Sequence, residues 1–392
     1  MFSKLLKLSF TIAIVMALAA CGNNMPVTPI LQTRTLSVPP PSHPVSVVTP
    51  TATQMPALEI TPTSLPILTT SPNIGLTSKM HSVPIPGVFV NHLALDDKYI
   101  YWTESGGNLF RFPLASSKST IATIFARTSF VKGILSGYPD QSLLRVGDWL
   151  IFDDRQITEQ TGTWALRAIN VETQTELNLA QGERPTILYT FSSDGEWVVW
   201  TTGNFSPDIV TAQNLQTGQR QELARSDPVQ NGWEQVAVSA GQAAAIQLSD
   251  NGRTLFLFEL NSGQSRKLLS DTTGSDMDGL TFDGNWIAWK TGTNYQGPTA
   301  LYNLQTAKTE LLPDWGIAPL LAGRWLTWNA TPEQPLYMVD LENRQSFIVA
   351  EAQPGDELTS VAIYGNVIVW CRLHSDLGHT KVDSRVEWRT LP

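Results

Sequence analysis

Three features of the amino-acid sequence predict an all-β fold for its larger part, residues 79–392. A short pattern, a turn followed by an apolar strand, recurs seven times at intervals of 39–50 residues. Nine of the 13 tryptophans fall inside these copies. A second, polar turn pattern follows most of them, as expected for consecutive antiparallel hairpins. Short strands at such a period are typical of a circular array of four-stranded sheets, so we predict a seven-bladed β-propeller.

The chain before the propeller begins with an export signal in residues 1–20. Two lysines, Lys4 and Lys7, precede an apolar run over residues 8–17, and small residues then lead to Cys21. The apolar run is too short for a comfortable membrane span. An ordinary secretory signal with an incidental cysteine is the alternative to a lipid-attachment site.

The segment that ends at Cys21 resembles the lipobox of bacterial lipoproteins. This resemblance implies that Cys21 receives a diacylglycerol thioether and becomes the new N-terminus. Two or three acyl chains, such as palmitate, hold a protein on a membrane durably, whereas a single chain binds marginally. We therefore expect a protein that is lipid-anchored to the cell membrane or the outer membrane and faces outside the cytoplasm.

Residues 21–78 are predicted to be the lipidated cysteine and a disordered linker. Eleven of the 25 prolines lie in residues 22–78, together with one acidic residue, Glu59, and no aromatic residue. Proline interrupts helices and sheets, and a segment without aromatic residues buries too little surface to offset the entropy of ordering. The stretch reads as a Pro/Thr/Ser-rich stalk that reaches on the order of 40 Å as a random coil.

Each copy of the first pattern predicts a strand that is buried on both faces. The segments 286–289 and 367–370 are apolar at every position, whereas a sheet with one wet face gives strict alternation. Blades that stack face to face around an axis bury both faces of such a strand. An open array of hairpins is the alternative, but it needs polar caps that the sequence lacks. The copies lie at 97–102, 147–152, 195–200, 241–246, 284–289, 323–328 and 365–370.

The second pattern is a polar turn that joins an alternating strand to a further strand. Its last position is often glycine, which suits a turn residue with positive φ. Each unit therefore reads as an inner strand, a motif strand, an alternating strand and an outer strand. The turns lie at 214–218, 259–263, 303–307 and 340–344, with a weaker form at 170–173.

The seventh unit lacks an outer strand of its own. We expect its inner strand near 358–364, its motif strand at 367–371 and its alternating strand at 386–389, after which the sequence reaches Pro392. The segment 80–85 belongs to no unit. We predict that it supplies the missing outer strand, because this closure removes a free sheet edge and an edge position tolerates Pro84.

The third unit resembles the repeat of TolB-type β-propellers. The resemblance rests on residues 193–200, which follow Ser192, and on the turn and strand at 214–220. Only this unit has the full Ser-x-Asp-Gly form, although the fifth keeps residues 282–284. The resemblance implies a propeller fold over residues 80–392, and it carries over no catalytic residue because the shared motif is structural. Better-known members often have six blades, whereas this sequence has seven copies.

Composition and motifs favour a binding protein. Thirty-five acidic against 26 basic residues give a net charge of −9, which argues against a nucleic-acid partner. Two cysteines cannot form a disulfide framework. The sequence has no serine-hydrolase elbow, zinc-protease motif, dinucleotide fingerprint or phosphate loop.

We therefore predict a monomeric, non-enzymatic platform without a cofactor. Its partners would be the membrane, through the lipid anchor, and an unknown envelope protein or small ligand. The alternative is an extracytoplasmic enzyme that processes glycans or peptides at the mouth of the propeller channel.

The candidate ligand-binding residues stand near the start of the inner strands, mostly eight residues before the repeated glycine. This register places them around one end of the central channel, here named the channel mouth. Aromatic and acidic side chains there would suit a cationic, sugar or peptide ligand. Packing of the tryptophans under neighbouring loops is the alternative. The residues are Trp233, Trp315, Asp276, Asp278 and Glu357.

Three further features are weaker. His374 and His379 share a predicted loop, 371–385, with two aspartates, but a solvated loop explains them better than a metal site, and we predict no metal. Cys371 reads as a small buried residue. The segment 276–279 looks like a fragment of a calcium loop that lacks the later carboxylate, so we predict a turn.

Overall fold

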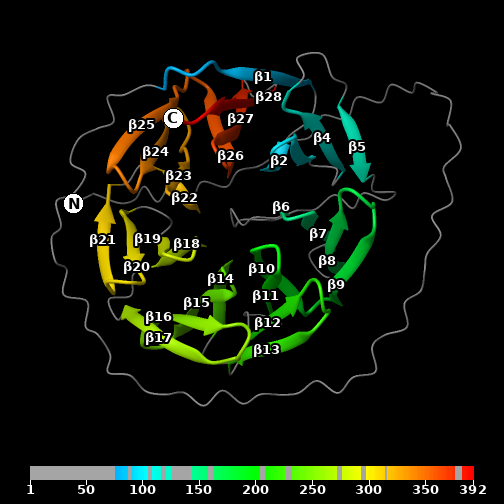
Figure 1. Cartoon of the computed structure of the whole chain (residues 1–392), viewed down its shortest axis with the longest axis vertical. Helices are drawn as coiled ribbons and strands as arrows, with labels where there is room; N and C mark the ends of the chain where they lie inside the picture. The colour runs from blue at the N-terminus through cyan, green and yellow to red at the C-terminus, as the bar shows by residue number, and fades with distance from the viewer. Residues whose placement is uncertain are drawn as a thin grey trace, which may run out of the picture. The chain divides into compact units, whose positions relative to one another are not determined.

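The computed structural model of the chain contains seven four-stranded antiparallel sheets arranged in a ring (Figure 1). The predicted seven-bladed β-propeller is confirmed. Within the described part of the chain, no helix is long and apolar enough to cross a membrane. The described residues are 76–86, 90–104, 108–115, 121–125, 143–157, 162–203, 208–226, 232–271, 276–292, 297–313, 316–375 and 382–392. Cys21 and the predicted signal and stalk lie outside them, apart from the last residues before the propeller.

The first three blades follow one another along the chain. Blade 1 contains β2 (Val90–Leu95), β3 (Tyr99–Glu104), β4 (Leu109–Pro113) and β5 (Ala122–Phe125). Blade 2 contains β6 (Leu143–Val146), β7 (Trp149–Ile157), β8 (Gly162–Asn170) and β9 (Glu176–Glu183). Blade 3 contains β10 (Ile187–Ser193), β11 (Trp197–Gly203), β12 (Ile209–Asn214) and β13 (Arg220–Arg225).

The remaining blades complete the ring. Blade 4 contains β14 (Gly232–Ser239), β15 (Gln242–Ser249), β16 (Gly252–Glu259) and β17 (Ser265–Asp271). Blade 5 contains β18 (Met277–Phe282), β19 (Trp286–Thr291), β20 (Thr299–Asn303) and β21 (Lys308–Leu312). Blade 6 contains β22 (Ile317–Ala322), β23 (Trp325–Asn329), β24 (Leu336–Asp340) and β25 (Gln345–Ala350). Blade 7 contains β26 (Asp356–Tyr364), β27 (Val367–Ser375), β28 (Val382–Thr390) and β1 (His81–Pro86).

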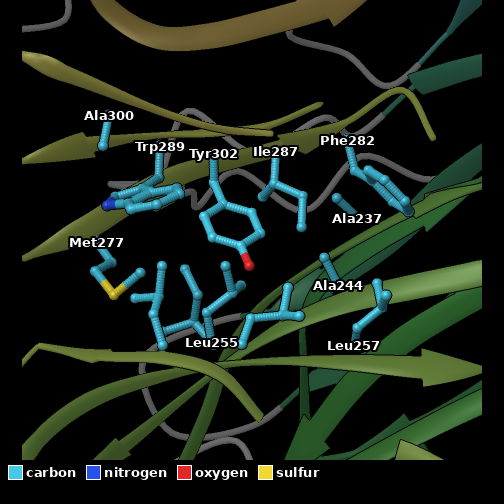
Figure 2. Close-up of a cluster of buried hydrophobic side chains, with 13 residues drawn as sticks. Ala237, Ala244, Leu255, Leu257, Met277, Phe282, Ile287, Trp289, Ala300 and Tyr302 are labelled. Atoms are coloured by element: carbon cyan, nitrogen blue, oxygen red, sulfur yellow. The ribbon is translucent and has the colours of Figure 1, made fainter. Parts of the chain in front are cut away.

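The hydrophobic core is divided among the blade interfaces. Each of seven buried clusters takes its side chains from two successive blades. Figure 2 shows the cluster between blades 4 and 5, where Trp289 and Ile287 of one blade face Leu255 and Leu257 of the other. The motif strands are therefore buried on both faces, as their unbroken apolar sequence predicts. Four motif tryptophans are among the largest fully buried side chains: Trp102, Trp200, Trp328 and Trp370.

Short polar turns with the same hydrogen bonds join strands in four of the blades. In the turn after β12, Asn214 Oδ1 accepts hydrogen bonds from the backbone N–H groups of Gln216 and Thr217 at 3.0 and 2.9 Å. Gly218 completes the turn with φ of +72°. This Asx turn is a local alternative to strand pairing and reverses the chain. Asn170, Asn303 and Asp340 make the same pair of bonds in blades 2, 5 and 6.

Polar side chains also tie neighbouring blades to one another around the channel. Each of four such side chains accepts a hydrogen bond from a backbone N–H in the next blade, which satisfies a donor on an otherwise free sheet edge. The result is a central cavity of about 170 Å³ lined by inner strands. The pairs are Ser192 with Val238, Gln235 with Leu280, Thr281 with Leu321, and Asn329 with Val361.

The ring closes as predicted, through the N-terminal strand. β1 pairs antiparallel with β28, from His81 opposite Trp388 to Pro86 opposite Asp383. The fixed segment begins earlier than expected, because Leu76 donates a backbone hydrogen bond to Ile348 of blade 6 at 3.3 Å. β1 is the outer edge strand of blade 7. Proline has no backbone N–H, and Pro84 is tolerated because no further strand pairs with the free edge of β1.

Candidate functional site

The structure places the predicted mouth residues at the start of the inner strands. Trp233 is the second residue of β14, Asp276 immediately precedes β18, Asp278 lies in β18, and Glu357 is the second residue of β26. The inner strands surround the centre of the ring (Figure 1). Trp315 lies outside the described residues. The predicted register is therefore found wherever the structure describes it.

Trp233 is buried in the interface between blades 3 and 4. Its ring is 4% exposed and packs edge-on against Phe256 and Phe258, with centroids 5.3 and 5.7 Å apart. The motif strand of this blade carries alanines, Ala243 and Ala245, where other blades carry larger residues. Trp233 fills the space that these small residues leave. Its ring thus lies in a packed core, and its contact with a ligand stays a prediction.

An arginine and two carboxylates connect blades 4 and 5 at the channel mouth. Arg253 Nε lies 2.8 Å from Glu234 Oε2, and its Nη2 lies 3.3 Å from Glu234 Oε1. The same Nη2 lies 2.9 Å from Asp276 Oδ1. All three side chains are largely buried, with exposed fractions of 15–25%. Asp276 was predicted as a mouth residue, whereas Glu234 and Arg253 were not.

Two further carboxyl groups at the mouth carry raised pKa values. Burial, together with the charges of Asp276 and Glu234, raises the pKa of Asp278 to about 6, although Arg253 opposes this shift. Burial also raises the pKa of Glu357. Three carboxyl groups thus lie near the Arg253 guanidinium, and Asp278 lies opposite Lys290 of β19, a fully buried residue, in the strand pairing.

The expectation of a turn at residues 276–279 is wrong. Met277 begins the inner strand β18, and the pairing with β19 shifts between Asp278 and Thr281, as in a β-bulge. Gly279 has φ of +65°, and a Cβ at this position would lie 2.8 Å from Pro319 Cδ of the next blade. Glycine is required here because the strand bends while touching its neighbour. The bulge sets the direction in which Asp278 leaves the strand.

A second charged group lies at the mouth end of blade 7. Arg372 forms ion pairs with Asp356 and Glu387, and Glu387 also accepts a hydrogen bond from Trp370 Nε1 at 2.8 Å. His374 Nδ1 lies 2.8 Å from Asp356 Oδ1, and the His374 side chain is 52% exposed. These groups lie within one blade.

The predicted loop 371–385 is shorter than expected. His374 lies in β27 because β27 extends to Ser375, and β28 begins at Val382. His379 lies outside the described residues. Within the described ranges, no group of three or more His, Cys, Asp or Glu side chains could hold a metal ion. Cys371 is fully buried, which confirms its interpretation, and burial raises the pKa of its thiol.

Comparisons with known proteins bear on the fold alone. No protein-family profile matches the chain, and no curated protein matches it in sequence. Oligogalacturonate lyase from Vibrio parahaemolyticus is similar with a TM-score of 0.53 and 10% identity, over 81% of this chain and 99% of that one. TolB from Acinetobacter baumannii is similar with a TM-score of 0.41 and 11% identity, over 79% of each chain. At these identities the likeness concerns the β-propeller fold alone, and membership of the TolB-type repeat family stays a prediction.

Proposed function

We propose that this protein is a lipid-anchored, extracytoplasmic binding protein whose propeller recognises a cationic ligand, or a basic segment of an envelope protein, at the channel mouth. The observation that carries this proposal is the gathering of Glu234, Asp276 and Asp278 near the guanidinium of Arg253. A cation that enters this group gains the attraction of partly buried carboxylates, which water screens less than surface charges.

The raised pKa of Asp278 gives the proposal a pH signature. At pH 5 most of this carboxyl is protonated, and at pH 7 it is ionised, because its pKa is about 6. A bound cation favours the ionised form. Affinity for a cation therefore rises between pH 5 and pH 7.

The position of β1 supports presentation of the mouth at a distance from a membrane. β1 is the outermost strand of blade 7, so residue 76 leaves the ring at its rim. The described N-terminal segment therefore leaves the ends of the inner strands uncovered. A tether joined at the rim suits display of a binding face.

The anchor is tested with full-length protein and a Cys21→Ser variant in a bacterial host. Labelling with radioactive palmitate and fractionation of membranes are the measurements. We expect label and membrane association in the parent protein and neither in the variant. Equal membrane association of an unlabelled variant would contradict the lipid anchor while leaving the binding proposal open.

The mouth is tested by calorimetry with a trilysine peptide at low ionic strength. Asp278→Asn should weaken binding about tenfold at pH 7.5, which corresponds to 1.4 kcal/mol. Glu259→Gln is the matched control, because it removes one negative charge from blade 4 at the other end of β16. Equal loss in both variants would indicate a general effect of net charge and reject the mouth as the site.

The second candidate function is an extracytoplasmic enzyme that processes glycans or peptides at the same mouth. It is favoured by Asp278, because a carboxyl group with a pKa of about 6 can donate or accept a proton near neutral pH. Incubation with acidic oligosaccharides and short peptides, followed by mass spectrometry, is the test. Product formation that disappears in Asp278→Asn would favour this function over binding alone.

A further inference from the structure

A second polar cavity lies away from the channel mouth. It has a volume of about 710 Å³ and is lined mainly by residues of blades 1 and 2, with Tyr364 of blade 7. Its lining includes Asp96 and Asp97, which follow the C-terminal end of the inner strand β2. The mouth residues lie at the opposite ends of the inner strands, so the two sites are separate.

A buried trio of side chains links blades 1 and 2 at this cavity. Arg145 Nε lies 2.8 Å from Asp96 Oδ2, and Tyr101 Oη donates to the same oxygen at 2.7 Å. The other oxygen, Asp96 Oδ1, accepts from the backbone N–H groups of Lys98 and Tyr99 at 2.8 and 2.7 Å. Burial would raise the pKa of Asp96, but these hydrogen bonds outweigh burial and lower it. The carboxylate is ionised and its acceptor capacity is in use.

Arg145 has a donor that this trio leaves unused. Its side chain is 8% exposed, and its Nη1 is buried with no hydrogen-bond partner within the described residues. A buried charged donor without an acceptor destabilises the fold, because its lost hydration is not replaced. Arg145 lines the cavity, but Nη1 itself has less than 1 Å² of accessible surface, so a neighbouring side chain must move for an acceptor from the cavity to reach it. An incoming oxyanion would satisfy Nη1 and form a charge-assisted hydrogen bond.

The turn itself does not require an arginine. Asp194 in blade 3 makes the same pair of backbone hydrogen bonds through Oδ1, to Glu196 and Trp197. Its second oxygen accepts from the backbone N–H of Gly241 in the next blade at 2.9 Å. A backbone donor therefore completes this link between blades 3 and 4. Between blades 1 and 2 the Arg145 guanidinium replaces this backbone donor, and its Nη1 has no acceptor among the described residues.

The charges around the cavity are separated by depth. Arg145 is buried, and Arg111 lies over the Tyr99 ring with its Cζ 4.9 Å from the centroid. Exposed acidic side chains line the same cavity at Asp97, Asp148 and Glu172. Positive charge thus lies toward the interior, and most of the exposed charge is negative although Lys98 is also exposed. A ligand with one negative end and one positive end matches this layout.

We propose that this cavity binds a small zwitterion, an amino acid or short peptide with a free carboxylate and a free amino group. The carboxylate accepts hydrogen bonds from Arg145 Nη1, and the ammonium group contacts the exposed carboxylates. The volume is within the range of small-molecule sites and accommodates a short peptide. The proposal does not depend on the function of the channel mouth.

The first test is calorimetry of the full-length protein with L-alanyl-L-alanine, its C-terminal amide and its N-acetyl form. We expect binding of the dipeptide, and loss of about tenfold in affinity when either charge is removed, which corresponds to 1.4 kcal/mol. Equal affinity for all three probes would overturn the proposal, as would the absence of dipeptide binding at millimolar concentration.

The second test uses variants. Arg145→Lys keeps the positive charge but loses the planar donor group, and it should weaken dipeptide binding about tenfold. Asp148→Asn should weaken binding of the dipeptide but leave binding of the N-acetyl form unchanged. Asp194→Asn is the control, because it alters the equivalent blade link away from the cavity and should leave affinity unchanged.

If Arg145→Lys does not fold, Arg111→Gln replaces it, because Arg111 also lines the cavity and its positive charge would attract the ligand carboxylate. Unchanged dipeptide affinity in folded Arg145→Lys, or in Arg111→Gln where that variant replaces it, would overturn the assignment of the carboxylate end.

Discussion

Arg253 at the channel mouth and Arg145 in the second cavity both form ion pairs with carboxylates, but the number of carboxylates differs. Arg253 is shared by two carboxylates, those of Glu234 and Asp276. Arg145 forms an ion pair with Asp96 and lies over the Tyr101 ring, and its Nη1 has no acceptor among the described residues. Both arginines join neighbouring blades. The comparison teaches that the ratio of guanidinium to carboxylate groups decides which charge of ligand each site favours.

The largest effect is expected from Trp233→Ala, which tests whether the mouth tryptophan serves packing. Its ring is buried against Phe256 and Phe258, so truncation leaves a cavity and should cost about 4 kcal/mol of unfolding free energy. Denaturant titration is the measurement. Trp149→Ala, at a partly buried ring in blade 2, is the control with a smaller expected loss. A loss for Trp233→Ala no larger than the control would show that its ring does not support the core.

The next largest effect is expected when each of the two arginines is replaced by methionine, because the two variants should lose different amounts of unfolding free energy. Arg145→Met leaves the buried Asp96 carboxylate without its cation and should cost about 3 kcal/mol. Arg253→Met leaves more exposed carboxylates and should cost about 1 kcal/mol. Urea unfolding at pH 7 compares them. A larger loss of unfolding free energy in Arg253→Met would contradict the view that the Arg145 ion pair contributes more to stability.

Asp278→Asn should increase the free energy of unfolding at pH 7.5 by about 1 kcal/mol. This value is smaller than the full equivalent of the raised pKa of Asp278, because solvent screens a partly exposed charge. The folded-state pKa is above the unfolded value, so ionisation destabilises the fold as pH rises from 4 through 6. Below pH 4 both states are protonated and the gain should vanish. Thermal unfolding between pH 3.5 and 7.5 measures this trend, and a gain that is independent of pH would contradict it.

The smallest effect is expected from Glu357→Gln, by the same reasoning in blade 7. Burial raises the pKa of Glu357, so removal of its charge should stabilise the protein by a few tenths of a kcal/mol at pH 7.5. Thermal unfolding at pH 7.5 and pH 4 is the measurement. Destabilisation at pH 7.5 would indicate that the ionised carboxylate makes a favourable contact.

The sequence predicts the blades well because each depends on local signals. Asx turns at Asn214 and Asn303, apolar motif strands and a period near 40–50 residues all recur, and every copy supports the same four-stranded unit. Closure by β1 was also predictable, since the last unit lacked one strand and residues 80–85 had no unit.

The charged clusters were less predictable because their partners come from different blades. Glu234 follows Trp233 directly, and a register argument extended by one residue would have found it. Arg145 and Asp96 are 49 residues apart and share no motif. Trp233 was predicted as a ligand contact, since the sequence does not show that Ala243 and Ala245 leave room for its ring. Such relationships depend on how adjacent sheets face each other.

The pairing of β1 with β28 also determines when this protein can finish folding. His81 is synthesised long before its partner Trp388, so the pairing between them cannot form until β28 has been made. A nascent chain that already contains six complete blades still has an open circle. Completion of the native ring is thereby postponed until β28 is available, and chains that stop short of β28 are left with an open ring that proteases can distinguish from the closed one.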